Sequence, residues 1–385
     1  MMKEKVSIDN NTQAFFELVR AGLWEKEARL APYGVVDFSE VLRLATEQSV
    51  VGLVAAGLEH VSDMKVPQER ALQFVGQTLQ IEQRNKAMNA FVAELIERLR
   101  KADIYAILVK GQGIAQCYEK PLWRASGDVD LLLNEENYLK AADNLKSIAT
   151  SVDEENPHNK HLAMTIDGWS VEMHGTLRSG LWKGLDEELD MVMEVVSLGE
   201  EKRSMEFYDS KGAKVQIHLP APDEDVIFVF SHILQHFFME GIGLRQICDW
   251  YRLLWTYREL LNQELLEQRI KKAGVMTEWK AFYMLAIKYL GMPEEVSCFM
   301  FQDARSEKWE KKANKVMAFV LETGNFGHNR DYSYYKKYPY LIYKVISLCH
   351  HIRDTYRYSL IFPLDSLRVM WSRLRAGVGM VASGK

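Results

Sequence analysis

The hydrophobic pattern of the chain changes its period twice, near residues 104 and 222. In residues 12–101 apolar side chains recur at helical intervals, most clearly over 37–61 and 87–101. Residues 104–109 (Ile-Tyr-Ala-Ile-Leu-Val) then form an apolar run too short for a helix and bounded by Lys-Gly-Gln-Gly, which predicts a buried strand. From residue 222 the helical pattern returns. The strands are therefore expected in a small central block between two helical regions.

The central block has the elements of a small mixed sheet. The Asp167-Gly168 pair, which separates two alternating runs, is the strongest two-residue hairpin signal in the chain. Two short helices fit between the strands, one ended by Pro121 and one capped by Asn134 or Asn137. The expected strands cover residues 104–109, 129–133, 161–166, 169–174 and 214–218, and the expected helices cover residues 113–119 and 137–147.

These patterns predict an α+β fold, with a small mixed-sheet core flanked by N-terminal and C-terminal helical regions. We expect an N-terminal helical region over residues 1–86, the core over 87–220 and a C-terminal helical domain over 221–385. The composition, 48% hydrophobic and 26% charged, is that of a globular protein and excludes a disordered or collagen-like chain. Four widely spaced cysteines form no disulfide framework.

Neither a signal peptide nor a membrane span is expected. The first residues, MMKEKVSIDNNTQ, lack the apolar stretch of a secretory signal. The longest apolar segments, such as VIFVFSHILQHFF, are shorter and more polar than a span of about 20 residues. We therefore expect a cytoplasmic protein without a transmembrane segment.

The C-terminal tail differs in charge from the rest of the chain. From Arg330 onward there are ten Lys or Arg residues, three Asp residues and eight tyrosines, although the whole chain has a net charge of −5. Basic residues interleaved with aromatic residues can bind nucleic acid or a membrane surface. The overall pI of about 6.1 is not that of a dedicated nucleic-acid binder. We favour a helical cap with tyrosines packed on the body, and nucleic acid remains a possible but less favoured partner.

Three acidic residues are expected to share one edge of the sheet. Asp128 and Asp130 lie two residues apart on a predicted strand, so both carboxylates project from the same face. Glu172, on a later strand, also faces away from its apolar neighbours, and His174 shares its face. Neighbouring strands lie about 4.8 Å apart, so the three carboxylates can share a cation. Hard oxygen ligands suit Mg²⁺.

The order of these features resembles the polymerase-β-like nucleotidyltransferases, and more narrowly a bacterial family of largely uncharacterised nucleotidyltransferases. The resemblance lies in residues 108–113 (Leu-Val-Lys-Gly-Gln-Gly), 123–132 (Trp-Arg-Ala-Ser-Gly-Asp-Val-Asp-Leu-Leu) and 171–174 (Val-Glu-Met-His), and it extends more loosely over most of the chain. It implies a polymerase-β-like core in which the Asp128 and Asp130 carboxylates hold two Mg²⁺ (or Mn²⁺) ions. The third acid, at Glu172, then completes the metal site and helps to activate the acceptor hydroxyl. These three residues are the expected catalytic and metal-binding group.

The nucleotide is expected to bind next to this group. The resemblance implies that the turn at Gly111, with Gln112 and Gly113, cradles the phosphates, although Gln112 stands where the general fold prefers Gly or Ser. Lys110 and Arg124 could neutralise the triphosphate, since ammonium and guanidinium groups match phosphate oxygens. The alternative roles are a solvated strand end for Lys110 and a structural salt bridge for Arg124.

Further residues could line the acceptor pocket, among them His174 beside Glu172. His232 and His236 lie four residues apart, a spacing that suits zinc, but no third ligand is evident, so a place on a helix surface or in the substrate pocket is favoured. Arg245 and Asp249, also four apart, are expected to form a helix pair and could line the acceptor pocket.

The expected function is the metal-dependent transfer of a nucleoside monophosphate from an NTP to an acceptor hydroxyl, with release of pyrophosphate. The acceptor, a small molecule or a macromolecule, is not apparent from the sequence. One alternative is a nucleotide-binding or regulatory module without turnover. A less favoured alternative is a metal-dependent glycosyltransferase, which also uses Asp-x-Asp but is expected to have a larger α/β domain before that motif.

Overall fold

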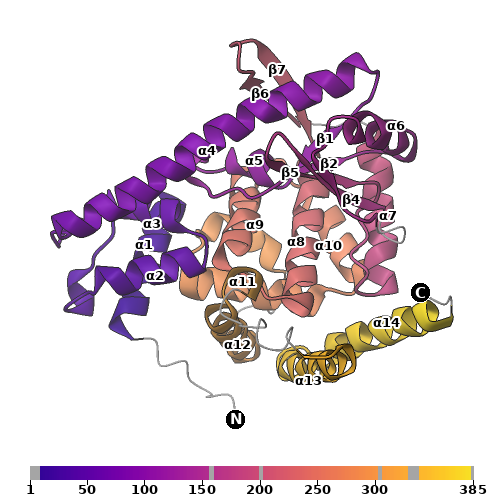
Figure 1. Cartoon of the computed structure of the whole chain (residues 1–385). Helices are drawn as coiled ribbons and strands as arrows, with labels where there is room; N and C mark the ends of the chain where they lie inside the picture. The colour runs from indigo at the N-terminus through magenta and orange to yellow at the C-terminus, as the bar shows by residue number, and fades with distance from the viewer. Residues whose placement is uncertain (1–8, 156–159, 199–202, 302–305, 328–337, 383–385) are drawn as a thin grey trace.

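The computed structural model describes residues 9–155, 160–198, 203–301, 306–327 and 338–382. Within these ranges the chain has the expected α+β fold, in which helices from both ends of the sequence enclose a small mixed sheet (Figure 1). None of the described helices has the combination of length and apolar character that crossing a membrane requires.

Capping residues and close glycine contacts shape the N-terminal helices. The elements are α1 (Asn10–Trp24), η1 (Ala31–Tyr33), α2 (Phe38–Glu47), α3 (Val51–Leu58) and α4 (Gln68–Lys101). The Asp9 and Asp37 side chains each accept a hydrogen bond from a first-turn amide of α1 and α2. Helices α1 and α3 approach closely because Gly57 has no side chain, and a Cβ there would lie 2.0 Å from the Leu18 carbonyl oxygen.

The strands form a five-stranded sheet and a separate hairpin. They are β1 (Ile107–Val109), β2 (Val129–Leu132), β3 (Ser151–Val152), β4 (His161–Ile166), β5 (Trp169–His174), β6 (Arg203–Tyr208) and β7 (Lys214–Leu219). The sheet order is β1-β2-β5-β4-β3, and β6 pairs with β7. Strands β2 and β5 are parallel and the other pairs antiparallel. The sheet is therefore mixed, with the two strands that carry the acidic residues side by side.

Several expected elements differ in extent from the structure. The first strand begins at Ile107 rather than at residue 104. The next helix, α5 (Gly111–Ala115), starts and ends earlier than the expected residues 113–119, and Pro121 opens a short 3-10 turn, η2 (Pro121–Trp123). The helix after β2 is α6 (Glu135–Lys146), capped by Asn134. Strands β3 and β6 and helix α7 (Lys183–Leu198) were not expected.

The two faces of the sheet pack against different helices. Apolar side chains from the C-terminal half of α4, from α6, from β6 and β7 and from one face of the sheet form one cluster. On the other face, Ile107, Val109 and Leu132 join a larger cluster shared by the N-terminal and C-terminal helices. The N-terminal and C-terminal helical regions thus have a common core beneath the sheet (Figure 1).

The 34-residue helix α4 connects this helical core to the sheet. Pro67 precedes its first residue, as expected, and the helix continues without a break past residue 86. It contacts α3, η2 and both strands of the β6–β7 hairpin. The division of the chain at residue 86 stays a prediction.

The C-terminal helices lie below the sheet in Figure 1. Tyr358 of the basic tail is buried against Phe237, Phe238 and Phe319, as expected for a helical cap. Tyr338 and Tyr356 differ from that expectation, since both are exposed. Other tyrosines of the tail, at 332, 334 and 335, lie outside the described residues.

The helices of the C-terminal region, from residue 222 onward, are α8 (Pro222–Met239), α9 (Leu244–Thr256), α10 (Gln263–Ala273), α11 (Met276–Leu290), η3 (Glu294–Met300), α12 (Glu307–Thr323), η4 (Asn325–Gly327), α13 (Tyr340–Ser359) and α14 (Pro363–Ala382).

Candidate active site

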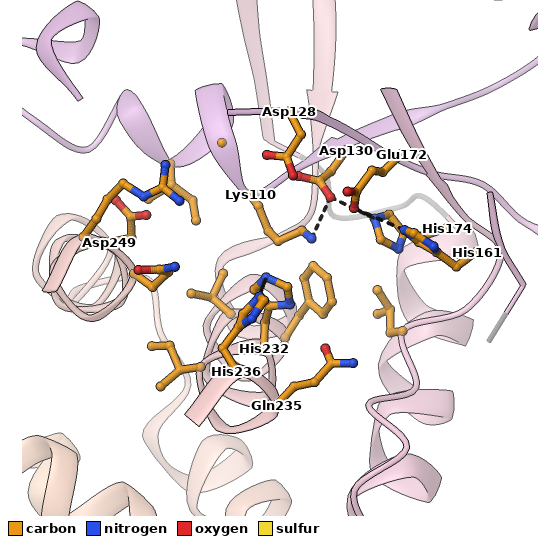
Figure 2. Close-up of a pocket in the computed structure, with 18 of the residues that line it drawn as sticks. Lys110, Asp128, Asp130, His161, Glu172, His174, His232, Gln235, His236 and Asp249 are labelled. Atoms are coloured by element: carbon orange, nitrogen blue, oxygen red, sulfur yellow. Dashed lines mark hydrogen bonds and ion pairs between the residues drawn. The ribbon is translucent and has the colours of Figure 1, made fainter. Parts of the chain in front are cut away.

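Three carboxylates meet where β2 and β5 run side by side. Asp130 is directly paired with Glu172 in the parallel register, and Asp128 precedes the first residue of β2. The alternating neighbours, among them Val129 and Met173, are fully buried on the opposite face, which fixes the direction of the acidic side chains. One oxygen from each carboxylate lies within 4.8 Å of the others (Figure 2). The structure thus brings together the three acidic residues expected from the sequence.

Lys110 contacts this acidic group directly. It follows the last residue of β1 and has the unusual backbone angles φ 57° and ψ −144°, which cost of order 1–3 kcal/mol for a residue with a side chain. Its ammonium lies 2.6 Å from Asp130 Oδ1, and the Lys110 and Asp130 side chains are only 11% and 3% exposed. The sharp turn after β1 therefore places a buried cation on Asp130.

The neighbouring charges give the two aspartates different pKa values. Burial acts to raise the pKa of the Asp130 carboxyl, but the Lys110 ammonium and the His174 ring hold that pKa below its ordinary value. The negative charge of Asp130, together with burial and Glu172, raises the pKa of Asp128 to about 6. Asp130 thus stays ionised, whereas Asp128 gains a proton on mild acidification.

Two histidines surround Glu172 on the same face. His174 Nε2 lies 2.8 Å from Asp130 Oδ1, and His161 Nε2 lies 3.2 Å from Glu172 Oε2. His161 was not among the residues singled out from the sequence. The two-residue Asp-Gly turn was the available signal, because it sets a register in which His161 is paired with His174.

A cavity of about 500 Å³ opens in front of the carboxylates. Its opposite wall is α8, which contributes Phe228, His232 and His236 (Figure 2). The two histidines contact each other through their Nε2 atoms at 2.9 Å, and His236 Nδ1 lies 3.3 Å from the Glu240 carboxylate. Burial, with the nearby Lys110 charge, lowers the pKa of His232 well below its usual value. This volume is within the range of small-molecule sites.

A buried ion pair closes the third side of the cavity. Arg124 Nε and Nη2 donate to the two carboxylate oxygens of Asp249 on α9, at 3.1 and 2.6 Å. The Tyr118 hydroxyl donates to the same carboxylate at 2.9 Å. Arg124 and Asp249 both line the cavity, but their charges are already matched to each other. The structural alternative considered for Arg124 is therefore present in the structure.

Further contacts hold the segment that leads to Asp128, which we call the 122–127 loop. Asn85 of α4 donates to two carbonyls of this loop at 2.8 and 2.7 Å, and Arg245 of α9 donates to a third at 2.9 Å. Gly52 of α3 touches the loop, since a Cβ there would lie 2.0 Å from the Trp123 carbonyl oxygen. Three helices distant in sequence thus position the Asp-x-Asp strand.

The expected nucleotide-binding residues divide into two groups. Lys110, Gly111 and Arg124 line the cavity. Gln112 and Gly113 do not line it: the Gln112 amide contacts Met88 Sδ inside the core, and Gly113 lies beside Leu219. The substrate-pocket candidates His174, His236, Arg245 and Asp249 all line the cavity.

The acidic group has the chemistry of a divalent-cation site. It supplies three carboxylates, the hard ligands that Mg²⁺ and Mn²⁺ accept, at separations that one ion or an adjacent pair can bridge. A cation would also relieve the repulsion between Asp128 and its two acidic neighbours, which is visible in its raised pKa. Among the described residues, His232 and His236 belong to no group of three possible ligands. The residues present therefore fit a divalent ion at the acidic group.

The α+β fold is consistent with a nucleotidyltransferase core, and comparison with known sequences gives the same class. The sequence profile of a family described as "Uncharacterised nucleotidyltransferase" matches residues 35–291. The chain belongs to this family of uncharacterised nucleotidyltransferases. No curated protein and no solved structure gives a significant match.

Proposed function

We propose that this protein transfers a nucleoside monophosphate from an NTP to an acceptor hydroxyl and releases pyrophosphate, with Mg²⁺ or Mn²⁺ held by Asp128, Asp130 and Glu172. One observation carries the proposal. Three carboxylates from adjacent strands lie within 4.8 Å of one another at the wall of a cavity of about 500 Å³. Membership of a nucleotidyltransferase family supports nucleotidyl transfer as the type of reaction.

The chain's own residues prepare the reacting groups. A divalent ion bound at the carboxylates would stabilise charge on the phosphate oxygens and make the acceptor hydroxyl more acidic. Lys110 and His174 hold the Asp130 carboxylate ionised and fixed in direction from two sides. The acceptor oxygen bonds to the α-phosphorus, the bond to the bridging oxygen breaks, and pyrophosphate leaves as the hydroxyl proton is released to solvent.

The two sides of the cavity suggest where each substrate binds. We assign the triphosphate to the side of Lys110 and Gly111, whose phosphate-cradling role follows from the family resemblance. We assign the acceptor to the α8 wall of the cavity, which carries His236 and the nearby His232. Arg124 and Asp249 then act by holding the 122–127 loop.

The test uses the full-length chain, each of the four NTPs labelled at the α-phosphate, Mg²⁺ or Mn²⁺, and cell extract as a source of acceptor. We expect pyrophosphate release and transfer of label to an acceptor from at least one NTP. Asp130→Asn should abolish both, because it removes a charged metal ligand. Glu136→Gln is the matched control, since this exposed carboxylate of α6 pairs only with Lys140 among the contacts of the described residues.

Two results would contradict the proposal. If no NTP transfers its label and nucleotides raise the melting temperature of the wild type and Asp130→Asn equally, the chain is a binding module without metal-dependent turnover. If nucleoside diphosphate is released from UDP-sugars and no pyrophosphate from NTPs, the glycosyltransferase alternative is correct.

A further inference from the structure

A second group of possible metal ligands lies beside the three carboxylates. His161, Glu172 and His174 each present one ligand atom, and these atoms lie within 4.8 Å of one another (Figure 2). Glu172 Oε2 is 3.2 Å from His161 Nε2 and 3.7 Å from His174 Nε2. The group shares Glu172 with the acidic group, contains neither aspartate and adds two imidazole nitrogens.

The sheet holds these ligands in a defined arrangement. His161 on β4 is directly paired with His174 on β5, and Glu172 lies two residues before His174 on the same face. The centroids of the two imidazole rings are 4.9 Å apart. All three side chains line the cavity and are partly exposed to it. The ligand atoms are therefore fixed by backbone pairing and can be reached by an ion from solvent.

We propose that His161, Glu172 and His174 bind a divalent first-row transition-metal ion. Two imidazoles and one carboxylate form a ligand set that such ions accept, whereas Mg²⁺ prefers oxygen ligands alone. Three protein ligands leave positions open for water or for oxygen atoms of a substrate. The inference goes beyond the proposed function, which requires only the oxygen ligands of the acidic group, and it does not depend on nucleotidyl transfer.

Glu172 couples the two metal positions. Its carboxylate belongs to both groups, as expected for two ions that share a bridging ligand. His174 Nε2 also contacts Asp130 Oδ1 at 2.8 Å. An ion bound to that nitrogen would replace this hydrogen bond, and Asp130 Oδ1 would keep its ion pair with Lys110. The two positions therefore differ in chemistry: one has only carboxylate oxygens and the other has two nitrogens.

The competing interpretation is a hydrogen-bonded network in which the histidines only orient the carboxylates. The substitution His161→Gln separates the two interpretations, because the Gln amide can still donate to Glu172 but supplies no ring nitrogen. His232→Gln is the matched control. It removes a ring nitrogen from the same cavity, at a position that belongs to neither group of possible ligands. His174→Gln provides a second variant for the same readout if His161→Gln does not fold.

The experiment uses the full-length chain, freed of metal with a chelator and titrated with Mn²⁺. Electron paramagnetic resonance of free Mn²⁺ gives stoichiometry and affinity, and pulsed measurements detect coupling of bound Mn²⁺ to ¹⁴N. We expect imidazole coupling in the wild type and in His232→Gln. In His161→Gln we expect affinity at the nitrogen-containing position to fall at least about tenfold and the coupling to decrease, with an unchanged circular dichroism spectrum.

The inference is overturned if bound Mn²⁺ shows no nitrogen coupling in the wild type. It is also overturned if His161→Gln and His174→Gln keep the parental affinity and coupling, or if only His232→Gln loses the coupling. Failure of the proposed function gives a different result. Nitrogen-coupled Mn²⁺ without label transfer from any NTP would leave this metal site intact and remove nucleotidyl transfer.

Discussion

Replacing Arg124 with methionine should show that the buried ion pair with Asp249 holds the site together. The Arg124 and Asp249 side chains are only 8% and 4% exposed, and two hydrogen bonds, at 3.1 and 2.6 Å, join them. Arg124 Nη1 also donates to the Ala125 carbonyl and the Ser126 hydroxyl. Arg124→Met therefore removes both the counter-ion of Asp249 and two contacts within the 122–127 loop.

The structure gives the size of the effect. In Arg124→Met the Asp249 carboxylate stays buried with the Tyr118 hydroxyl but without its counter-ion. Removal of one partner from a buried ion pair costs about 3–5 kcal/mol of the free energy of unfolding. The double variant Arg124→Met/Asp249→Leu removes both charges of the ion pair, so we expect it to regain about 2 kcal/mol or more.

Urea unfolding followed by tryptophan fluorescence measures these differences. Arg43→Met is the control: Arg43 pairs with two glutamates of its own helix, its side chain is half exposed, and its loss should cost less than about 1 kcal/mol. A change below about 1 kcal/mol for Arg124→Met, or a double variant as unstable as the single variant, would refute the reasoning. Nucleotide binding gives a second readout. It should recover in the double variant if Arg124 holds the loop, and stay lost if Arg124 binds phosphate.

Three further outcomes are expected. Asp130→Asn should lower the free energy of unfolding by about 1.5–3 kcal/mol, because Lys110 loses a charged partner. It should also abolish the thermal shift that Mg²⁺ and NTP produce, and an undiminished shift would exclude Asp130 as a metal ligand. Burial raises the pKa of the Glu278 carboxyl well above 4.5, so its contribution to stability is present below pH 4.5 and is lost as the pH rises toward the folded-state pKa. Glu278→Gln should therefore be more stable than the wild type at pH 7 and lose this advantage below pH 4.5, whereas parallel urea midpoints across the pH range would contradict the assignment. Gly57→Ala should lower the free energy of unfolding in urea by about 1–3 kcal/mol or more, because the new Cβ would lie 2.0 Å from the Leu18 carbonyl oxygen. A urea midpoint equal to that of the wild type would mean that α1 and α3 can separate at no cost.

The sequence was sufficient to predict the acidic face, because local alternation fixes it. Val129 and Leu131 are apolar and fully buried, so Asp128 and Asp130 between and beside them must face the other way. The same argument applies to Glu172: its neighbours Val171 and Met173 are fully buried, so Glu172 must face the opposite side of the sheet. The match over residues 35–291 confirms the family that these residues suggested. Their catalytic roles stay predictions.

Features set by distant contacts were harder to predict. Strand β6 alternates, but most of its residues are partly or fully exposed, so it lacks the apolar run that marked β1 and β2. The ion pair between Lys110 and Asp130 depends on a backbone turn with positive φ at a residue other than glycine, which no propensity favours. Arg124 and Asp249 are 125 residues apart, and nothing in either local pattern indicates their partnership.

The clamping of the 122–127 loop by α9 has a consequence for how the site forms during synthesis. The ribosome makes Arg124 well before Asp249, and at about 5–20 residues per second the interval of 125 residues lasts about 6–25 seconds. For most of that time the segment with both aspartates has been synthesised, but the helix that contacts the preceding loop has not. The nascent chain therefore carries its acidic residues early, but acquires a shaped substrate cavity only when α8 and α9 dock.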